Sequence, residues 1–132
     1  PAAVARLKTI HADLRRFTPN RSGYDLVVSH FFLDCLTDEE VAALVERILP
    51  HLTPGATWLI SEFAIPERGW LRVLGRLLVG FLYFAFNKMT HLQVRQIPDY
   101  ARTLIRYGFR RQRQVRFLGG LLVADAWKLT EK

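Results

Sequence analysis

The sequence has almost none of the residues that build covalent cross-links, since Cys35 is its single cysteine. One cysteine excludes an internal disulfide framework and a multi-cysteine zinc site. The start of the chain, Pro1 to Arg6, has no long apolar segment followed by a cleavage site, so we expect no secretory signal peptide. Both absences are typical of a protein of the reducing cytoplasm, and we expect that location.

Long hydrophobic runs are also absent. The longest extends from Leu77 to Phe86 and is bounded by Arg76 and Lys88. It is about half as long as the roughly twenty residues that a membrane-spanning helix needs. The run therefore predicts a buried or interfacial helix and no membrane span.

Apolar residues and arginine are abundant. Hydrophobic residues make up 50% of the 132 positions, which is enough for one globular domain over residues 1–132. The 19 lysines and arginines exceed the 12 acidic residues and give a net charge of +7. This charge permits contact with nucleic acid or an anionic membrane but establishes neither. We interpret most of it as a solvated surface, with a nucleic-acid-binding module as the weaker alternative.

The first half of the chain predicts a strand–helix–strand unit. Tyr24–Ser29 is an apolar, β-branched run without alternation, as in a strand covered on both faces. Thr37 is expected to cap a helix, with Glu40 at the capping-box position. Pro54 and Gly55 predict a turn before the next strand, Thr57–Phe63. The spacing suits a right-handed parallel crossover.

The flanking segments predict further elements. Leu7–Ala12 alternates and predicts a short strand, whereas Gly69–Lys88 and Pro98–Tyr107 predict helices. Arg111–Phe117 carries polar side chains on both faces, which a central strand could not tolerate. With the apolar segment Leu121–Leu129 it predicts a terminal antiparallel hairpin whose polar strand lies at a sheet edge.

Three segments, Tyr24–His30, Leu49–Ala56 and Leu59–Phe63, resemble the class I S-adenosylmethionine-dependent methyltransferases. With the helices and the hairpin, the resemblance covers roughly residues 7–129. It implies an α/β fold with a Rossmann-like, mostly parallel sheet and a C-terminal antiparallel hairpin. It also implies a helical insertion at about residues 67–107 that caps a substrate pocket.

The chain departs from this family at one point. The family begins with a strand, a glycine-rich turn, a helix and a second strand, but no G-x-G occurs here. Such a turn lets backbone N–H groups approach the cofactor closely. The chain therefore resembles the C-terminal part of a methyltransferase that lacks the family's first two strands, and half of the expected cofactor site is missing.

The resemblance implies roles for individual residues around S-adenosylmethionine. Asp13 corresponds to the acid that contacts the adenine amino group, and the Leu14 backbone N–H would bind the ring. The alternative is that Asp13 is only a turn-forming carboxylate after a strand. Ser29 and His30 end a strand beneath the methionine part of the cofactor, where open α/β sheets bind ligands. His30 is also the candidate catalytic residue, because imidazole can deprotonate or orient a hydroxyl. The alternative is that His30 only lines the pocket.

The acceptor of the methyl group is predicted from the apolar side chains nearby. Phe31, Tyr83 and Phe84 are the candidate substrate-binding residues and suit a small, apolar acceptor, although a dimer interface would explain the apolar helix equally well. Family members that methylate nucleobase amino groups carry a proline-containing motif where this chain has Ser29 to Phe32. That difference argues against a nucleic-acid substrate. The scattered histidines, without carboxylates at ligand spacing, predict no metal site.

The function predicted from the sequence is methyl transfer from S-adenosylmethionine to a small, apolar acceptor. The alternative is a non-catalytic, methyltransferase-like interaction or assembly domain. Without the family's first two strands, Tyr24–Ser29 would have an unpaired apolar edge, which templates pairing with another chain. We therefore expect an N-terminal segment, or a second copy in a homodimer, to complete the sheet.

Overall fold

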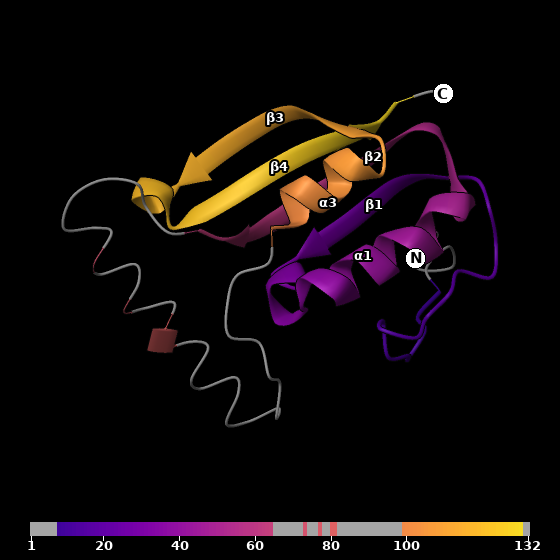
Figure 1. The fold of residues 1–132 in the computed structure, drawn as a ribbon, viewed down its shortest axis with the longest axis horizontal. Coiled ribbons are helices and arrows are strands. Elements are labelled where there is room, and N and C mark those ends of the chain that lie inside the picture. Colours follow the sequence, from indigo (N-terminus) through magenta and orange to yellow (C-terminus); the bar gives the residue numbers. More distant parts are fainter. Residues whose placement is uncertain (1–7, 65–72, 74–76, 78–79, 82–98, 131–132) are drawn as a thin grey trace, which may run out of the picture.

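The computed structural model describes residues 8–64, 73, 77, 80–81 and 99–130. They form a four-stranded sheet in the order β1-β2-β4-β3, with two helices on one face (Figure 1). The strands are β1 (Tyr24–His30), β2 (Leu52–Phe63), β3 (Phe109–Phe117) and β4 (Leu122–Leu129). The helices are α1 (Asp38–Ile48) and α3 (Tyr100–Arg106), with short 3-10 turns η2 (Leu33–Cys35), η3 (Leu49–His51) and η4 (Leu118–Gly120).

The β1–α1–β2 unit confirms the predicted parallel crossover. β1 and β2 pair in parallel, with Val27 beside Trp58 and Val28 beside Leu59. The predicted capping box starts α1: the Thr37 hydroxyl accepts from the Glu40 N–H over 3.2 Å, and the Thr37 N–H donates to the Glu40 carboxylate over 3.0 Å. These bonds satisfy N–H groups that the first helical turn leaves unpaired.

The core lies between the sheet and its two helices. Trp58 and Ile60 of β2 and Trp127 of β4 are each only 1% exposed. They pack against buried apolar side chains of the helices, namely Val41, Leu44, Val45 and Leu104. Because side chains alternate along a strand, the neighbouring residues face the other way. There Leu26, Val28 and Leu59 are 50%, 48% and 38% exposed.

That exposure corrects the expectation that Tyr24–Ser29 is covered on both faces. The described residues cover only the face that carries Val27 and Ser29, and no described strand pairs with the outer edge of β1. One face of this apolar strand is therefore exposed to solvent. Its composition fits a strand that is buried on both faces, but no element in the described part of the chain packs against the second face.

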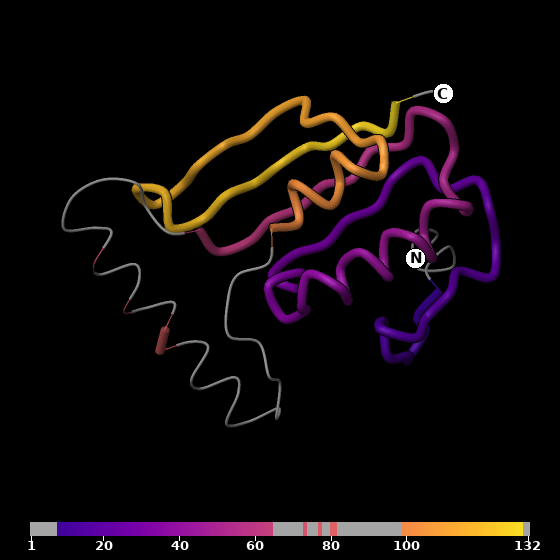
Figure 2. Tube along the Cα trace, in the orientation of Figure 1, coloured from indigo at the N-terminus to yellow at the C-terminus, as the bar shows by residue number. Residues whose placement is uncertain are grey.

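The segment at residues 8–12 forms no strand and is exposed, which corrects the prediction for Leu7–Ala12; Leu7 itself lies outside the described residues. An alternating pattern becomes a strand only when a neighbouring strand satisfies its backbone groups. The described residues offer it no such neighbour. The trace in Figure 2 shows residues 8–23 (indigo) looping beside α1 before they enter β1.

The sheet is not mostly parallel within the described residues. β1 and β2 are its one parallel pair, whereas β4 pairs antiparallel with both β2 and β3. The α/β class and the C-terminal hairpin are confirmed, with polar β3 at the sheet edge.

Two boundaries differ from prediction. Pro54 and Gly55 lie inside β2, which starts at Leu52. The register shifts beside them, since Tyr24 pairs with Leu52 but Leu26 pairs with Thr57, and Gly55 has a φ of 75°. The expected turn is therefore a bulge.

The helix predicted before Gly108 is present as α3, and Gly108 follows it with a φ of 90°. Glycine adopts this left-handed conformation without steric cost. Within the described part of the chain, no helix is both long and apolar enough to cross a membrane. The helix predicted at Gly69–Lys88 lies largely outside the described residues.

Candidate functional site

The carboxyl ends of β1 and β2 lie side by side because the strands are parallel. His30 and Ser61 are register partners, and the Phe31 N–H continues the pairing by donating to the Ser61 carbonyl over 2.8 Å. Open α/β sheets bind ligands at such strand ends. The candidate site is therefore this end of the sheet.

The turn that follows β1 is held by a residue of β2. Phe31 has a φ of 50°, which is uncommon for a side chain other than glycine. One carboxylate oxygen of Glu62, Oε1, accepts from the Phe32 N–H over 3.2 Å and from the Leu33 N–H over 2.9 Å. The Phe31 ring lies 4.9 Å from the Phe63 ring. Glu62 and Phe63 thus fix the end of β1.

Glu62 is itself only 1% exposed. Burial, and then the charge of Asp34, raise the pKa of Glu62 to about 7, although backbone N–H groups of the turn oppose the rise. Burial also raises the pKa of Asp34. The second Glu62 oxygen, Oε2, is buried without a hydrogen-bond partner among the described residues. This pair of carboxyl groups can hold a proton near neutral pH.

Cys35 follows directly but is not an activated nucleophile. Burial, and then Asp34, raise the pKa of its thiol to about 11. Because the thiolate is the reactive form, the side chain is a weakly polar, half-buried group.

Ser29 and His30, both predicted to contact the cofactor, do not share one pocket. The Ser29 hydroxyl faces the helices and accepts from the Trp58 indole N–H over 3.0 Å. His30 lies on the opposite face of the sheet and is exposed. Only His30 is therefore open to a molecule approaching the uncovered face, and both contacts with the cofactor stay predictions.

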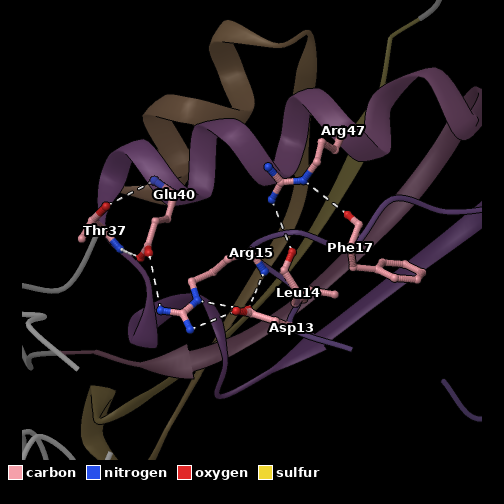
Figure 3. A network of polar contacts seen from close by, with 7 residues as sticks. All are labelled: Asp13, Leu14, Arg15, Phe17, Thr37, Glu40 and Arg47. Carbon is pink, nitrogen blue, oxygen red and sulfur yellow. Dashed lines mark hydrogen bonds and ion pairs between the residues drawn. The ribbon is translucent and has the colours of Figure 1, made fainter. Parts of the chain in front are cut away.

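Asp13 is exposed and is held by a neighbouring arginine (Figure 3). The Arg15 guanidinium donates to its carboxylate over 3.0 and 3.1 Å, and the Arg15 N–H adds a bond of 3.0 Å. These hydrogen bonds lower the pKa of Asp13. Arg15 also lies 4.0 Å from Glu40 at the start of α1.

Arg47 of α1 anchors the following residues (Figure 3). Its guanidinium donates to the carbonyls of Leu14 and Phe17, each over 3.3 Å. The segment that carries Asp13 and Leu14 is therefore attached to the helix, although it lacks the strand predicted before it. A bond from the Leu14 N–H to the adenine ring stays a prediction.

A cavity of about 320 Å³ opens along the outer edge of β1. It brings together the predicted cofactor-binding residues Leu14 and Ser29, whereas Asp13 and His30 are not part of its wall. Its other walls are largely apolar and include Phe17, Leu44 and Ile48. A flat, weakly polar group suits such walls better than a charged one.

A second cavity of about 280 Å³ lies between α3 and strands β3 and β4. Asp125 is 3% exposed and forms part of its wall. Tyr100 and Gln114 each donate to the Asp125 carboxylate over 2.9 Å, and Arg111 lies 3.9 Å away. Burial, and then Asp125, raise the pKa of Tyr100, so its hydroxyl stays a donor.

Sequence reasoning missed Glu62 and Asp125 as parts of these sites. Each is the acidic residue of an otherwise largely apolar stretch of strand. Acidic side chains are almost never fully buried unless paired, so a lone acid in a buried strand was the available signal.

Among the predicted acceptor-binding residues, Phe31 is exposed at the strand end, and Tyr83 and Phe84 lie outside the described residues. The part of the chain that the structure describes contains no cluster of potential metal ligands.

Comparison with known proteins finds similar solved structures but no matching family model and no matching curated protein. TnmH matches with a TM-score of 0.69 and 18% identity over 96% of this chain and 36% of its own. Mitomycin 7-O-methyltransferase MmcR matches with a TM-score of 0.68 and 17% identity, over 98% of this chain and 36% of MmcR. OxaC in complex with SAH and oxaline matches with a TM-score of 0.66 and 13% identity, over 97% of this chain and 31% of OxaC.

The chain therefore spans about a third of the length of each of these structures. At identities this low, the structural matches establish a shared fold and nothing more. The mixed four-stranded sheet, its two helices and the terminal hairpin are the elements on which that fold is built. Over nearly its whole length the chain shares its fold with a part of TnmH and of mitomycin 7-O-methyltransferase MmcR.

Proposed function

We propose that this chain is the acceptor-side part of an S-adenosylmethionine-dependent methyltransferase that acts on a small, apolar molecule. The observation that carries the proposal is the fold shared over nearly the whole chain with structures such as MmcR, whose name states 7-O-methyl transfer. The exposed His30 and the Phe31–Phe63 ring pair stand at the strand ends where this fold binds ligands.

The described residues fit only one side of the cofactor. Leu14 and Ser29 meet in a largely apolar cavity, where Leu14 would lie against the adenine ring and Ser29 beneath the methionine part. The Ser29 hydroxyl is already engaged by Trp58, and the chain contains no G-x-G turn. When bound, S-adenosylmethionine supplies a methyl group on a positively charged sulfur. This chain supplies part of its cradle, and another stretch of polypeptide supplies the rest.

The open edge of β1 is the place where that polypeptide joins. Leu26, Val28 and Leu59 are exposed beside it, and unpaired strand edges readily accept a further strand. In this proposal residues 1–132 act as one domain. A segment of the same protein, or a second copy of this chain, completes the sheet and the cofactor site.

The residues of the proposed reaction are few. His30 faces the open side of the sheet and would accept the proton of an acceptor hydroxyl or orient that hydroxyl. Phe31, together with Tyr83 and Phe84 of the helical insertion at about residues 67–107, would hold the apolar body of the acceptor. Positioning and exclusion of water supply most of the acceleration in such a transfer.

The decisive experiment measures the intact mass of the protein as expressed and its binding of S-adenosylmethionine by calorimetry. A chain heavier than 15.3 kDa that binds the cofactor supports the proposal. A mass of 15.3 kDa without binding supports a non-catalytic interaction domain instead. Transfer of a labelled methyl group to small aromatic alcohols then tests the reaction itself.

Two variants locate the chemistry within the full protein. His30→Ala should lower the turnover number by about 10²- to 10⁴-fold, the usual contribution of a general base. His11→Ala, at another exposed position, is the matched control and should leave turnover unchanged. Phe84→Ala should weaken binding of the apolar acceptor more than binding of the cofactor. Equal losses of both affinities would show that Phe84 packs elsewhere.

The proposed acceptor is not a nucleobase, because Ser29 to Phe32 replace the proline-containing motif typical of base methylation. Incubation of the full protein with nucleic acid and labelled cofactor should leave adenine and cytosine unlabelled. Labelled bases would contradict the small-molecule assignment while leaving methyl transfer intact.

A further inference from the structure

We propose that Glu62 is the positioning residue of the methyl-transfer site. Its carboxylate fixes the turn from Phe31 to Leu33, and this turn sets where His30 and Phe31 stand at the carboxyl end of β1. The assignment of that end as the reaction site rests on the proposed function, whereas the hold of Glu62 on the turn does not.

The first step of the inference is the pair of bonds that Glu62 accepts. Phe32 and Leu33 follow β1, where their N–H groups no longer have a partner in the sheet. Both donate to Oε1 of Glu62, over 3.2 and 2.9 Å. A buried carboxylate that accepts two backbone N–H groups makes stronger bonds than a neutral oxygen would. One side chain of β2 therefore satisfies the whole start of the turn.

The second step is the conformation that these bonds maintain. Phe31 has a φ of 50°, and residues in sparsely populated regions persist only when their surroundings hold them. On one side of Phe31 the chain is held by the bond to the Ser61 carbonyl. On the other side it is held by Glu62. Phe63 supports the Phe31 ring from the same strand.

The third step is that the Glu62 carboxyl is buried against a second acid, Asp34. Oε2 is buried and has no hydrogen-bond partner among the described residues. The burial of two neighbouring carboxyl groups beside the strand end is typical of a site where protonation matters.

Protonation of Glu62 would change the strength of its hold on the turn. Burial and the charge of Asp34 raise its pKa to about 7, so the carboxyl changes charge across neutral pH. A protonated carboxyl accepts more weakly from the two N–H groups. The titratable and charged groups on the elements packed around it are Asp34 and Cys35 of η2, Tyr100 of α3, Asp125 of β4 and Arg111 of β3.

The test follows the Phe32 and Leu33 amide signals of the full protein by NMR across neutral pH. In the native protein both signals should titrate with a midpoint near 7. Glu62→Gln keeps an acceptor oxygen of the same size, so the turn should persist while the titration centred near pH 7 is lost. The remaining pH dependence comes from Asp34, and the double variant Glu62→Gln, Asp34→Asn should remove it. Glu62→Leu removes the acceptor, and hydrogen exchange at both amides should become about ten-fold faster or more.

Asp125→Asn is the matched control, since Asp125 is another buried carboxyl on the same sheet face but contacts side chains. It should leave the titration of the Phe32 and Leu33 signals in place. Loss of that titration in Asp125→Asn but not in Glu62→Gln would overturn the proposal. So would unchanged amide exchange in Glu62→Leu.

Methyl-transfer kinetics form a separate arm. Glu62→Leu should lower the turnover number by about ten-fold or more with little change in the KM for the cofactor, because misplacement of reacting groups acts on turnover. Glu62→Gln should restore most of the turnover. If no variant and no native sample transfers methyl groups, the proposed function fails, but the amide signals still decide whether Glu62 positions the turn.

Discussion

The indole N–H of Trp58 donates a hydrogen bond to the Ser29 hydroxyl over 3.0 Å, across the parallel pairing of β1 and β2. Trp58 is 1% exposed, and a buried indole N–H needs an acceptor. Ser29 therefore stabilises the buried Trp58 side chain. The resemblance to methyltransferases predicts that the same residue contacts the cofactor. The two roles can be separated by substitution.

Ser29→Ala should lower the free energy of unfolding by about 1–3 kcal/mol, because it leaves the Trp58 N–H buried without an acceptor. Urea denaturation of the full protein measures this change. Ser29→Thr keeps the hydroxyl that accepts from Trp58. As the control, it should retain most of the stability that Ser29→Ala loses. A Ser29→Ala variant as stable as the native protein would show that the Trp58 N–H finds another partner.

The stability of the protein should fall as the pH rises from about 4.5 to about 7, the ordinary and the native pKa of Glu62. In this window the native state retains a proton that the unfolded chain releases, so the free energy of unfolding decreases with pH. The slope from one such group is at most about 1.4 kcal/mol per pH unit. Above pH 7 Glu62 adds no further slope.

Glu62→Gln should flatten this pH dependence in part, because Asp34 also has a raised pKa and contributes with the same sign. The double variant Glu62→Gln, Asp34→Asn should remove it. Thermal denaturation at a series of pH values measures the effect. A native slope of the opposite sign would mean that the two carboxyl groups are ionised throughout.

The isolated 132-residue chain should associate with itself at micromolar concentration. Leu26 and Val28 are about half exposed beside the open edge of β1, and burial of a large apolar side chain contributes roughly 1.5–3 kcal/mol. Val28→Lys should weaken the association, as measured by light scattering. Ile105→Lys, at an apolar position of α3 that is 63% exposed, is the control. A strictly monomeric chain that melts cooperatively would refute this prediction.

Thr37→Ala should lower the free energy of unfolding by about 0.5–2 kcal/mol, because it removes the hydroxyl that caps the first turn of α1. Thr37→Ser retains the oxygen and should recover most of that loss. Both values come from denaturant titration of the full protein. Equal stabilities of the alanine and serine variants would show that the capping box adds nothing to folding.

Residues close together in sequence determined much of this structure. The capping box at Thr37 and Glu40, the glycine after α3 and the hairpin with polar β3 at the edge were all predictable. Each depends on spacings of a few residues, where backbone conformation and local hydrogen bonds decide the outcome. The similarity to methyltransferases likewise depends on an order of elements that the sequence displays.

Only the tertiary structure decided how the site is assembled. Glu62 accepts hydrogen bonds from the N–H groups of Phe32 and Leu33, which lie about thirty residues earlier in the sequence. No local sequence pattern predicts this contact. The segment at residues 8–12 alternates like a strand but remains unpaired, because a strand requires a partner that sequence periodicity cannot supply. Local propensity sets which elements can form, whereas hydrogen bonds and burial between distant residues set which of them do.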